Sequence, residues 1–177
     1  MAKYISTKET AVLLRQALKA AFPGTKFSVR KSTGTASSWI NVSWEDGPTT
    51  QAVDAITDTY EGSKFNGMTD SYDQMPDQLI AFSADEMPEE VRFGCSGILT
   101  HRDMGEEGKR AALAVLIENN RTMNIVNAEG GYNEKLNKEV IPSLYAGEYR
   151  LWSPYDLPQA TWQVFSQLNL QKVVAKK

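Results

Sequence analysis

The stretch Lys3–Met68 is KYISTKETAVLLRQALKAAFPGTKFSVRKSTGTASSWINVSWEDGPTTQAVDAITDTYEGSKFNGM. Within it, Ser6–Glu9 has the S-x-x-E pattern of a capping box, in which each end residue bonds the backbone amide of the other at a helix start. Apolar residues then recur at helical spacing as far as Phe22. The sequence therefore predicts a helix that ends at Phe22, because Pro23-Gly24 cannot continue it.

Two strands and a second helix are predicted after this first helix. Lys26–Lys31 and Trp39–Trp44 alternate apolar with polar residues, which is the pattern of half-buried strands. Glu45–Pro48 is expected to turn, because Gly47 tolerates positive φ and Pro48 presets φ for the helix that follows.

The rest of the chain predicts further strands and helices. Lys64–Asp70 is expected to add a strand beside the first two, with Phe65 and Met68 in the core, and Val91–Thr100 to form another strand. Three helices are predicted in the second half: Glu106–Asn120, Asn133–Leu144 and Ala160–Leu170.

These elements indicate an α+β fold. We expect a small antiparallel sheet packed on helices, with an α-β-β-α start and a mostly helical C-terminal half. Residues 1–72 should form one module, residues 73–90 an acidic connection, and residues 91–177 a strand and helices that complete the same domain.

Four short blocks carry a resemblance to a known family. They are KYISTKETA, AFPGTKFSVR, VSWEDGPT and FNGMTD, in this order. Over residues 3–72, and more weakly near Val91–Thr100, the chain resembles a module of the large polyvalent protein-associated domains. The resemblance implies a setting in phages or conjugative plasmids, where such modules occur. It implies no activity, because the family has no catalytic signature to transfer onto these residues.

Length and composition are those of an ordinary globular domain. The chain has 177 residues, of which 41% are hydrophobic and 23% charged. No run approaches the roughly 18 apolar residues of a membrane-spanning helix, and the start lacks the shape of a signal peptide. Cys95 is the only cysteine, so an intrachain disulfide is excluded. We expect the protein in the cytoplasm of the host cell.

Charge is unevenly placed along the chain. The net charge is −3, yet residues 1–35 hold seven Lys/Arg and one Glu, whereas residues 36–95 hold two Lys/Arg and twelve Asp/Glu. Such a bipolar distribution can steer charged partners.

The basic first third supplies candidate contacts with nucleic acid or another partner. Cations can neutralise phosphates, and an aromatic ring on the outer face of a strand can stack on a base. The candidates are Lys8, Arg15, Lys19, Lys26, Arg30, Lys31 and Trp39. The alternative interpretation is a solvated helix face without a partner.

The acidic middle supplies a candidate partner patch that would imitate phosphate charge. Its members are Asp70, Asp73, Asp77, Asp85, Glu86, Glu89 and Glu90. They lack the D-x-[DN]-x-[DN]-G order of a calcium loop, so no metal site is predicted. A solvated acidic surface is the alternative.

No catalytic set stands out. His101-Arg102-Asp103 imitates the catalytic triplet of protein kinases, but the other kinase motifs are missing. Cys95 and His101 could form a nucleophile pair, yet no third activating group is identifiable. One thiol and one imidazole do not make a zinc site. We predict no catalytic residue, no metal and no cofactor.

The preferred hypothesis is a non-enzymatic accessory protein of a phage or plasmid. It would bind a host macromolecule, such as a protein or protein complex of a defence system, as the resemblance and the lack of a catalytic set favour. One alternative is a nucleic-acid-binding module that uses the N-terminal basic face. Another is an enzyme with an unrecognised carboxylate site. No membrane partner is predicted, and the oligomeric state stays open.

Overall fold

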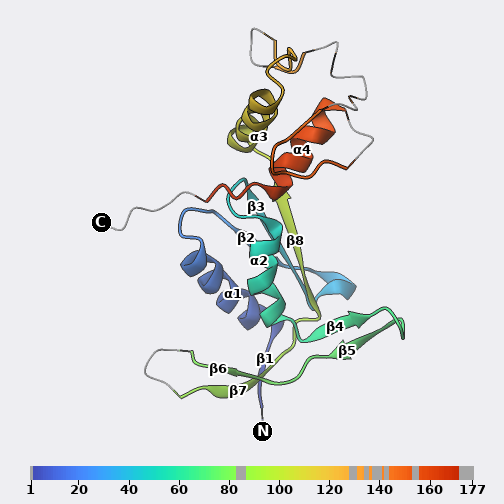
Figure 1. The fold of residues 1–177 in the computed structure, drawn as a ribbon. Coiled ribbons are helices and arrows are strands. Elements are labelled where there is room, and N and C mark those ends of the chain that lie inside the picture. Colours follow the sequence, from blue (N-terminus) through green and yellow to red (C-terminus); the bar gives the residue numbers. More distant parts are fainter. Residues whose placement is uncertain are drawn as a thin grey trace. The chain divides into compact units, whose positions relative to one another are not determined.

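The computed structural model describes residues 2–82, 87–127, 131–133, 136, 141, 144–152 and 156–171. Contacts divide them into two compact units, one of residues 2–44, 50–102 and 171, the other within 45–49 and 103–170. The elements, drawn in Figure 1, are β1 (Lys3–Ile5), α1 (Thr7–Ala21), β2 (Ser28–Lys31), β3 (Trp39–Glu45), α2 (Thr50–Thr57), β4 (Ser63–Asn66), β5 (Ser71–Gln74), β6 (Gln78–Ile80), β7 (Glu89–Phe93), β8 (Gly97–Asp103), α3 (Glu106–Asn119) and α4 (Leu157–Gln167).

Helix α1 begins with the predicted capping box. The Glu9 amide donates to Ser6 Oγ (3.4 Å), and the Ser6 amide donates to Glu9 Oε2 (2.9 Å). These bonds satisfy amides that a helix start leaves unpaired, and the bond from the Ser6 hydroxyl lowers the pKa of Glu9. At the other end the Phe22 amide donates to the Leu18 oxygen (2.9 Å). The predicted end of the helix before Pro23 is confirmed.

The main core of the first unit lies between α1, α2 and a three-stranded sheet of order β2-β3-β8. Strands β2 and β3 are antiparallel, with Ser28 opposite Ser43 and Lys31 opposite Ile40. They match the two strands predicted from alternation. The core of this sheet and its helices includes Leu14, Leu18, Ile40, Val42, Trp44 and Val53.

The prediction of one strand over Val91–Thr100 is wrong. Strand β7 ends at Phe93, β8 begins at Gly97, and the two belong to different sheets. Strand β7 lies between β1 and β6 and runs parallel to β1, whereas β8 pairs with β3. Alternation alone does not show where the chain passes from one sheet to another.

The α+β class is confirmed, but the predicted order of elements is not. Strand β1 precedes α1, so the chain does not start as α-β-β-α. A three-residue strand is too short to show an alternating pattern. The C-terminal half is not mostly helical either. Among its described residues, only Glu106–Asn119 (α3) and Leu157–Gln167 (α4) are helical. Most of the predicted helix Asn133–Leu144 lies outside the described residues.

Strands β4 and β5 form a separate antiparallel hairpin. Of the strand predicted at Lys64–Asp70, only Lys64–Asn66 is strand, because residues 67–70 form the turn, and it pairs with β5 and not with the β2–β3 sheet. Phe65 and Met68, expected in the core, are instead 53% and 97% exposed. Phe65 lies directly opposite Tyr72, so both rings share one face of the hairpin. In Figure 1 the hairpin tip points away from α1 and α2.

The residues between β7 and β8 connect the elements of the first unit. The Gly94 amide donates to the Ile5 oxygen of β1 (2.8 Å). The Gly62 amide, just before β4, donates to the Cys95 oxygen (2.7 Å). This short segment therefore connects the β1-β7-β6 sheet to the base of the β4–β5 hairpin.

The same segment also meets the β2-β3-β8 sheet. Ser96 bonds to Ser38, the residue immediately before β3. The Ser96 amide donates to the Ser38 backbone oxygen, and the Ser96 hydroxyl donates to the Ser38 hydroxyl (both 2.8 Å). At Gly97 an added Cβ would lie 2.5 Å from Cζ3 of Trp39. The absence of a side chain at Gly97 is what lets the indole ring lie against β8.

The second unit is organised by the Glu45–Pro48 turn. Gly47 has the predicted positive φ (59°), and Asp46 has one as well (53°), so two successive residues are left-handed. Asp46 Oδ1 accepts hydrogen bonds from the amides of Gly105 (2.8 Å) and Gly108 (3.1 Å) at the start of α3. Asp46 thus supplies the cap that Gly105, at the N-cap position, cannot provide.

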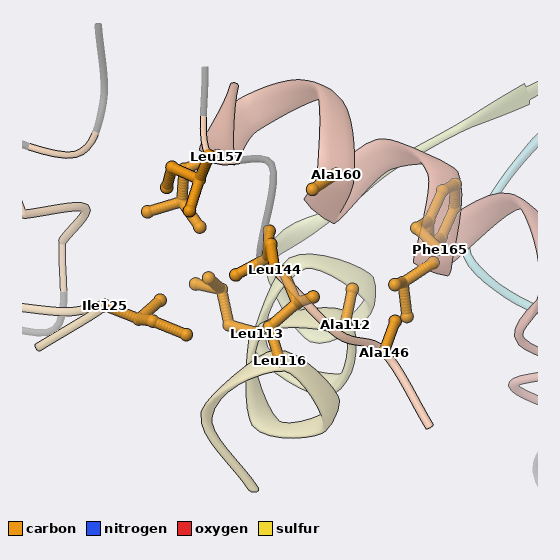
Figure 2. Packing of buried hydrophobic residues seen from close by; sticks show 11 residues of the cluster. Ala112, Leu113, Leu116, Ile125, Leu144, Ala146, Leu157, Ala160 and Phe165 are labelled. Atoms are coloured by element: carbon orange, nitrogen blue, oxygen red, sulfur yellow. The ribbon is translucent and has the colours of Figure 1, made fainter. Parts of the chain in front are cut away.

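Helices α3 and α4 bury the core of the second unit between them. Figure 2 shows Leu113 and Leu116 of α3 facing Leu157 and Phe165 of α4. Leu116 and Leu157 are 0% exposed. The packing of these apolar side chains of α3 and α4 accounts for the position of both helices within their unit.

Replacing Gly62 by alanine should destabilise the first unit. A Cβ at Gly62 would lie 1.9 Å from the Phe93 carbonyl oxygen, so the backbone must shift, at a cost of about 1–3 kcal/mol. Gly67→Ala is the matched control, because the nearest atom to a Cβ there is 3.9 Å away; it should change stability by less than about 0.5 kcal/mol. Urea unfolding compares the variants, and equal midpoints would contradict this account.

Candidate functional site

Two surfaces of the first unit combine exposed side chains with a defined geometry. The first, which we name the basic hollow, has a volume of about 490 Å³ and lies between α1 and the segment that leads from α1 into β2. Three of the predicted basic contact residues therefore meet at one place. The residues that line the basic hollow are Arg15, Lys19, Pro23, Thr25, Lys26 and Phe27.

The walls of the basic hollow are held by contacts within the fold. Arg15 Nη2 donates to the Val29 backbone oxygen (2.6 Å), which ties the guanidinium to β2. The centroid of the Phe27 ring lies 5.9 Å from that of Phe22 and 5.5 Å from that of Trp44. A fixed cation and a fixed aromatic ring thus border the same space.

The other predicted cations do not line this hollow. Lys8 is exposed in the first turn of α1, and Arg30 and Lys31 are exposed on β2. No carboxylate of the described residues forms an ion pair with Lys19 or Lys26. The positive charge of the hollow is therefore not neutralised by the described part of the chain.

The second surface, which we name the hairpin face, consists of Phe65, Met68 and Tyr72 on the β4–β5 hairpin. The Phe65 and Tyr72 ring centroids are 5.3 Å apart, and Tyr72 meets Trp39 edge-on at 6.0 Å and 90°. Trp39, predicted as an exposed stacking platform, is half-buried and supports the hairpin face. Phe65 and Tyr72 remain 53% and 54% exposed.

The predicted acidic residues are divided between two strand pairs. Asp70 and Asp73 belong to the β4–β5 hairpin, and Glu90 is exposed on β7. Asp85 and Glu86 lie outside the described residues. Asp73 of β5 and Glu90 of β7 therefore belong to different sheets.

Two further members of the acidic set form ion pairs within the fold. Arg92 donates to Asp77 through Nε (2.6 Å) and Nη2 (2.9 Å). This bidentate hydrogen bond lowers the pKa of Asp77. Lys3 Nζ donates to Glu89 Oε2 (2.8 Å), which links β1 to its neighbour β7. Both carboxylates therefore have a role in holding the β1-β7-β6 sheet and its flank.

The family model gives an independent view of the region that holds both surfaces. Residues 5–105 match the family described as large polyvalent protein associated domain 29. The chain belongs to this family. The match spans α1 to β8 and so includes the basic hollow and the hairpin face. Comparison with curated proteins and with solved structures gives no match.

The thiol and the imidazole of this family member, Cys95 and His101, do not form a pair. Cys95 is 1% exposed and its Sγ donates to the Gly97 oxygen (3.3 Å). Burial raises the pKa of the Cys95 thiol to about 11. His101 is exposed on β8 and is not bonded to Cys95 in the described structure. The pair thus lacks the geometry of an activated nucleophile.

The described residues contain neither a metal-ligand cluster nor a membrane-spanning helix. They hold no group of three His, Cys, Asp or Glu side chains that could bind a metal ion. Nor do they include a helix that is both long and apolar enough to cross a membrane.

Glu61 is a structural carboxylate that the sequence did not reveal. Its Oε1 accepts a hydrogen bond from the Ile98 amide (2.7 Å) at the start of β8. Burial raises its pKa. The sequence signal is only an acidic residue after a helix, and the partner lies 37 residues further on.

Iodoacetamide should react very slowly with Cys95 in the folded protein. A thiol pKa of about 11 leaves roughly one thousandth as thiolate at pH 8, and burial blocks access. Mass spectrometry with and without urea measures the labelling, and equal rates would show that the thiol is accessible.

The raised pKa of Cys95 also predicts how stability depends on pH. Because the pKa is raised in the folded state, the free energy of unfolding should fall as the pH rises from 9.0 towards about 11.

Proposed function

We propose that this chain is a non-enzymatic accessory protein of a phage or plasmid that binds a protein of its host. Membership of the family supports the mobile-element setting. The observation that carries the binding proposal is the hairpin face, where three apolar side chains stay exposed on one hairpin. A component of a host defence system is the partner class that this setting favours.

The hairpin face has the physical properties of a binding surface. Single exposed apolar residues are ordinary, but contiguous ones are typical of interaction sites. The Tyr72 ring contacts the rings of both Trp39 and Phe65. Such prepositioned aromatic rings lose little conformational freedom on binding and are enriched among the residues that dominate binding energy.

Substitution of Phe65 tests this proposal. The tagged full-length chain should retain a specific host protein from lysate after nuclease treatment, and Phe65→Ala should reduce its recovery about tenfold or more, because hot-spot aromatics supply most of the binding energy. Leu79→Ala is the matched control, because Leu79 is also exposed (74%) but lies on β6.

Quantitative mass spectrometry measures the recovery, with circular dichroism to confirm that both variants are folded. A host protein retained equally by Phe65→Ala and by the unsubstituted chain would remove the hairpin face from the proposal. No retained host protein after nuclease treatment would contradict the proposed function itself.

Nucleic-acid binding is the second candidate, and the basic hollow is the observation that favours it. Lys19 and Lys26 form no ion pair among the described residues, and Arg15 is oriented by its bond to Val29. Phosphates that contact these cations would release counterions, which makes the affinity fall steeply with salt. Phe27 would offer an apolar wall beside them.

Charge reversal in the hollow separates this candidate from the first. If the hollow binds phosphates, Lys19→Glu with Lys26→Glu should weaken binding of a labelled single-stranded oligonucleotide about tenfold or more and reduce the salt slope by about one per lysine. Lys8→Glu, on the same helix but outside the hollow, is the control. Fluorescence anisotropy over a salt series measures both quantities. Binding that is equally weak in all variants would reject the hollow as a nucleic-acid site.

A further inference from the structure

We propose that Met68, at the tip of the β4–β5 hairpin, enters an apolar pocket with a basic rim on the partner protein. This inference rests on the proposed function and names the chemistry of the surface that the hairpin face meets.

The turn that carries Met68 is held by its own hydrogen bonds. Asn66 Oδ1 accepts from the Met68 amide (3.0 Å), and Asn66 Nδ2 donates to Asp73 Oδ2 across the hairpin (2.7 Å). The Thr69 amide donates to the Asn66 oxygen (3.2 Å), and the Thr69 and Ser71 hydroxyls bond each other (2.9 Å). Met68 is therefore presented from an ordered backbone.

The side chain of Met68 does not serve the fold. It is 97% exposed, and turns favour Gly, Asn, Asp and Ser, not methionine. It lies in the turn between β4 and β5, the strands that carry Phe65 and Tyr72. Methionine is unbranched and polarisable, so it fills irregular apolar pockets well. These properties fit an anchor that is buried only on binding.

The charge next to Met68 indicates which kind of charged residue surrounds such a pocket on the partner. Asp70 is exposed, and its carboxylate bonds to no described residue. Asp73 lies further along β5, directly opposite Lys64 of β4. Lys64 is the cation of the hairpin, and it lies on the face opposite to that of Phe65. The tip is therefore acidic, which complements Lys or Arg on a partner. An anionic membrane surface would repel it.

Two pairs of variants test the anchor and the rim separately in the full-length chain. Met68→Ala should weaken binding to the host protein recovered above about tenfold or more, whereas Met87→Ala, at an 86% exposed methionine, should not. Asp70→Lys should slow association and reverse its dependence on salt. Asp58→Lys, at another exposed aspartate, is its control.

Photo-cross-linking identifies what the tip touches. A diazirine amino acid at position 68 is cross-linked in nuclease-treated host lysate, and the product is mapped by mass spectrometry. The inference expects a cross-link to an apolar segment of that host protein with Lys or Arg beside it. Reversing that Lys or Arg to Asp should restore the binding lost in Asp70→Lys.

Other outcomes overturn the inference. A cross-link to lipid, or to a second copy of this chain, would assign the tip to a membrane or to self-association. Retention that depends on Phe65 but is unchanged by Met68→Ala and Asp70→Lys would refute the anchor and leave the proposed function standing. If the unsubstituted chain retains no host protein at all, the proposed function fails, and the inference with it.

Discussion

The segment between β7 and β8 is the constraint on which the first unit depends. Here the chain leaves one sheet and enters another, so its backbone groups lack regular strand partners. The Gly94 amide donates to the Ile5 oxygen of β1, and the Cys95 oxygen accepts from the Gly62 amide. Just inside β8, the Ile98 amide donates to the Glu61 carboxylate. A buried backbone group without a partner costs free energy comparable to a lost hydrogen bond. The surrounding elements must therefore be in place together for this crossing to be stable.

This dependence extends to the hairpin face. Ser63 Oγ at the start of β4 donates to the Ser96 oxygen (2.7 Å), so the base of the hairpin is bonded to the crossing segment. Further along, Trp39 of β3 meets Tyr72 of β5 edge-on. The hairpin is thus fixed by polar bonds at its base and by rings on its face. A surface that is ordered before it meets a partner loses less entropy on binding than a mobile loop would.

Features decided by neighbouring residues could be predicted from the sequence. The capping box at Ser6 and the left-handed Gly47 follow from side chains and backbone preferences within a few residues. The break within Val91–Thr100 could not, because both halves alternate like strands and only pairing with distant β1 and β3 separates them. Phe65 likewise fits a strand whether its face meets a core or solvent. For the site, charge identified three cations of the basic hollow, but the aromatic wall at Phe27 depends on tertiary packing.

The charge pattern of the sequence does not show which charged residues are paired within the fold. Two of the acidic residues that suggested a patch, Asp77 and Glu89, are paired with Arg92 and Lys3. Exposed charges that remain are screened beyond about 10 Å at 0.1 M salt, so each acts only close to a partner. Charge then governs orientation and the rate of approach, whereas burial of apolar surface supplies most of the affinity. It follows that the position of exposed apolar side chains on an ordered hairpin is stronger evidence for an interface than the bipolar charge of the chain.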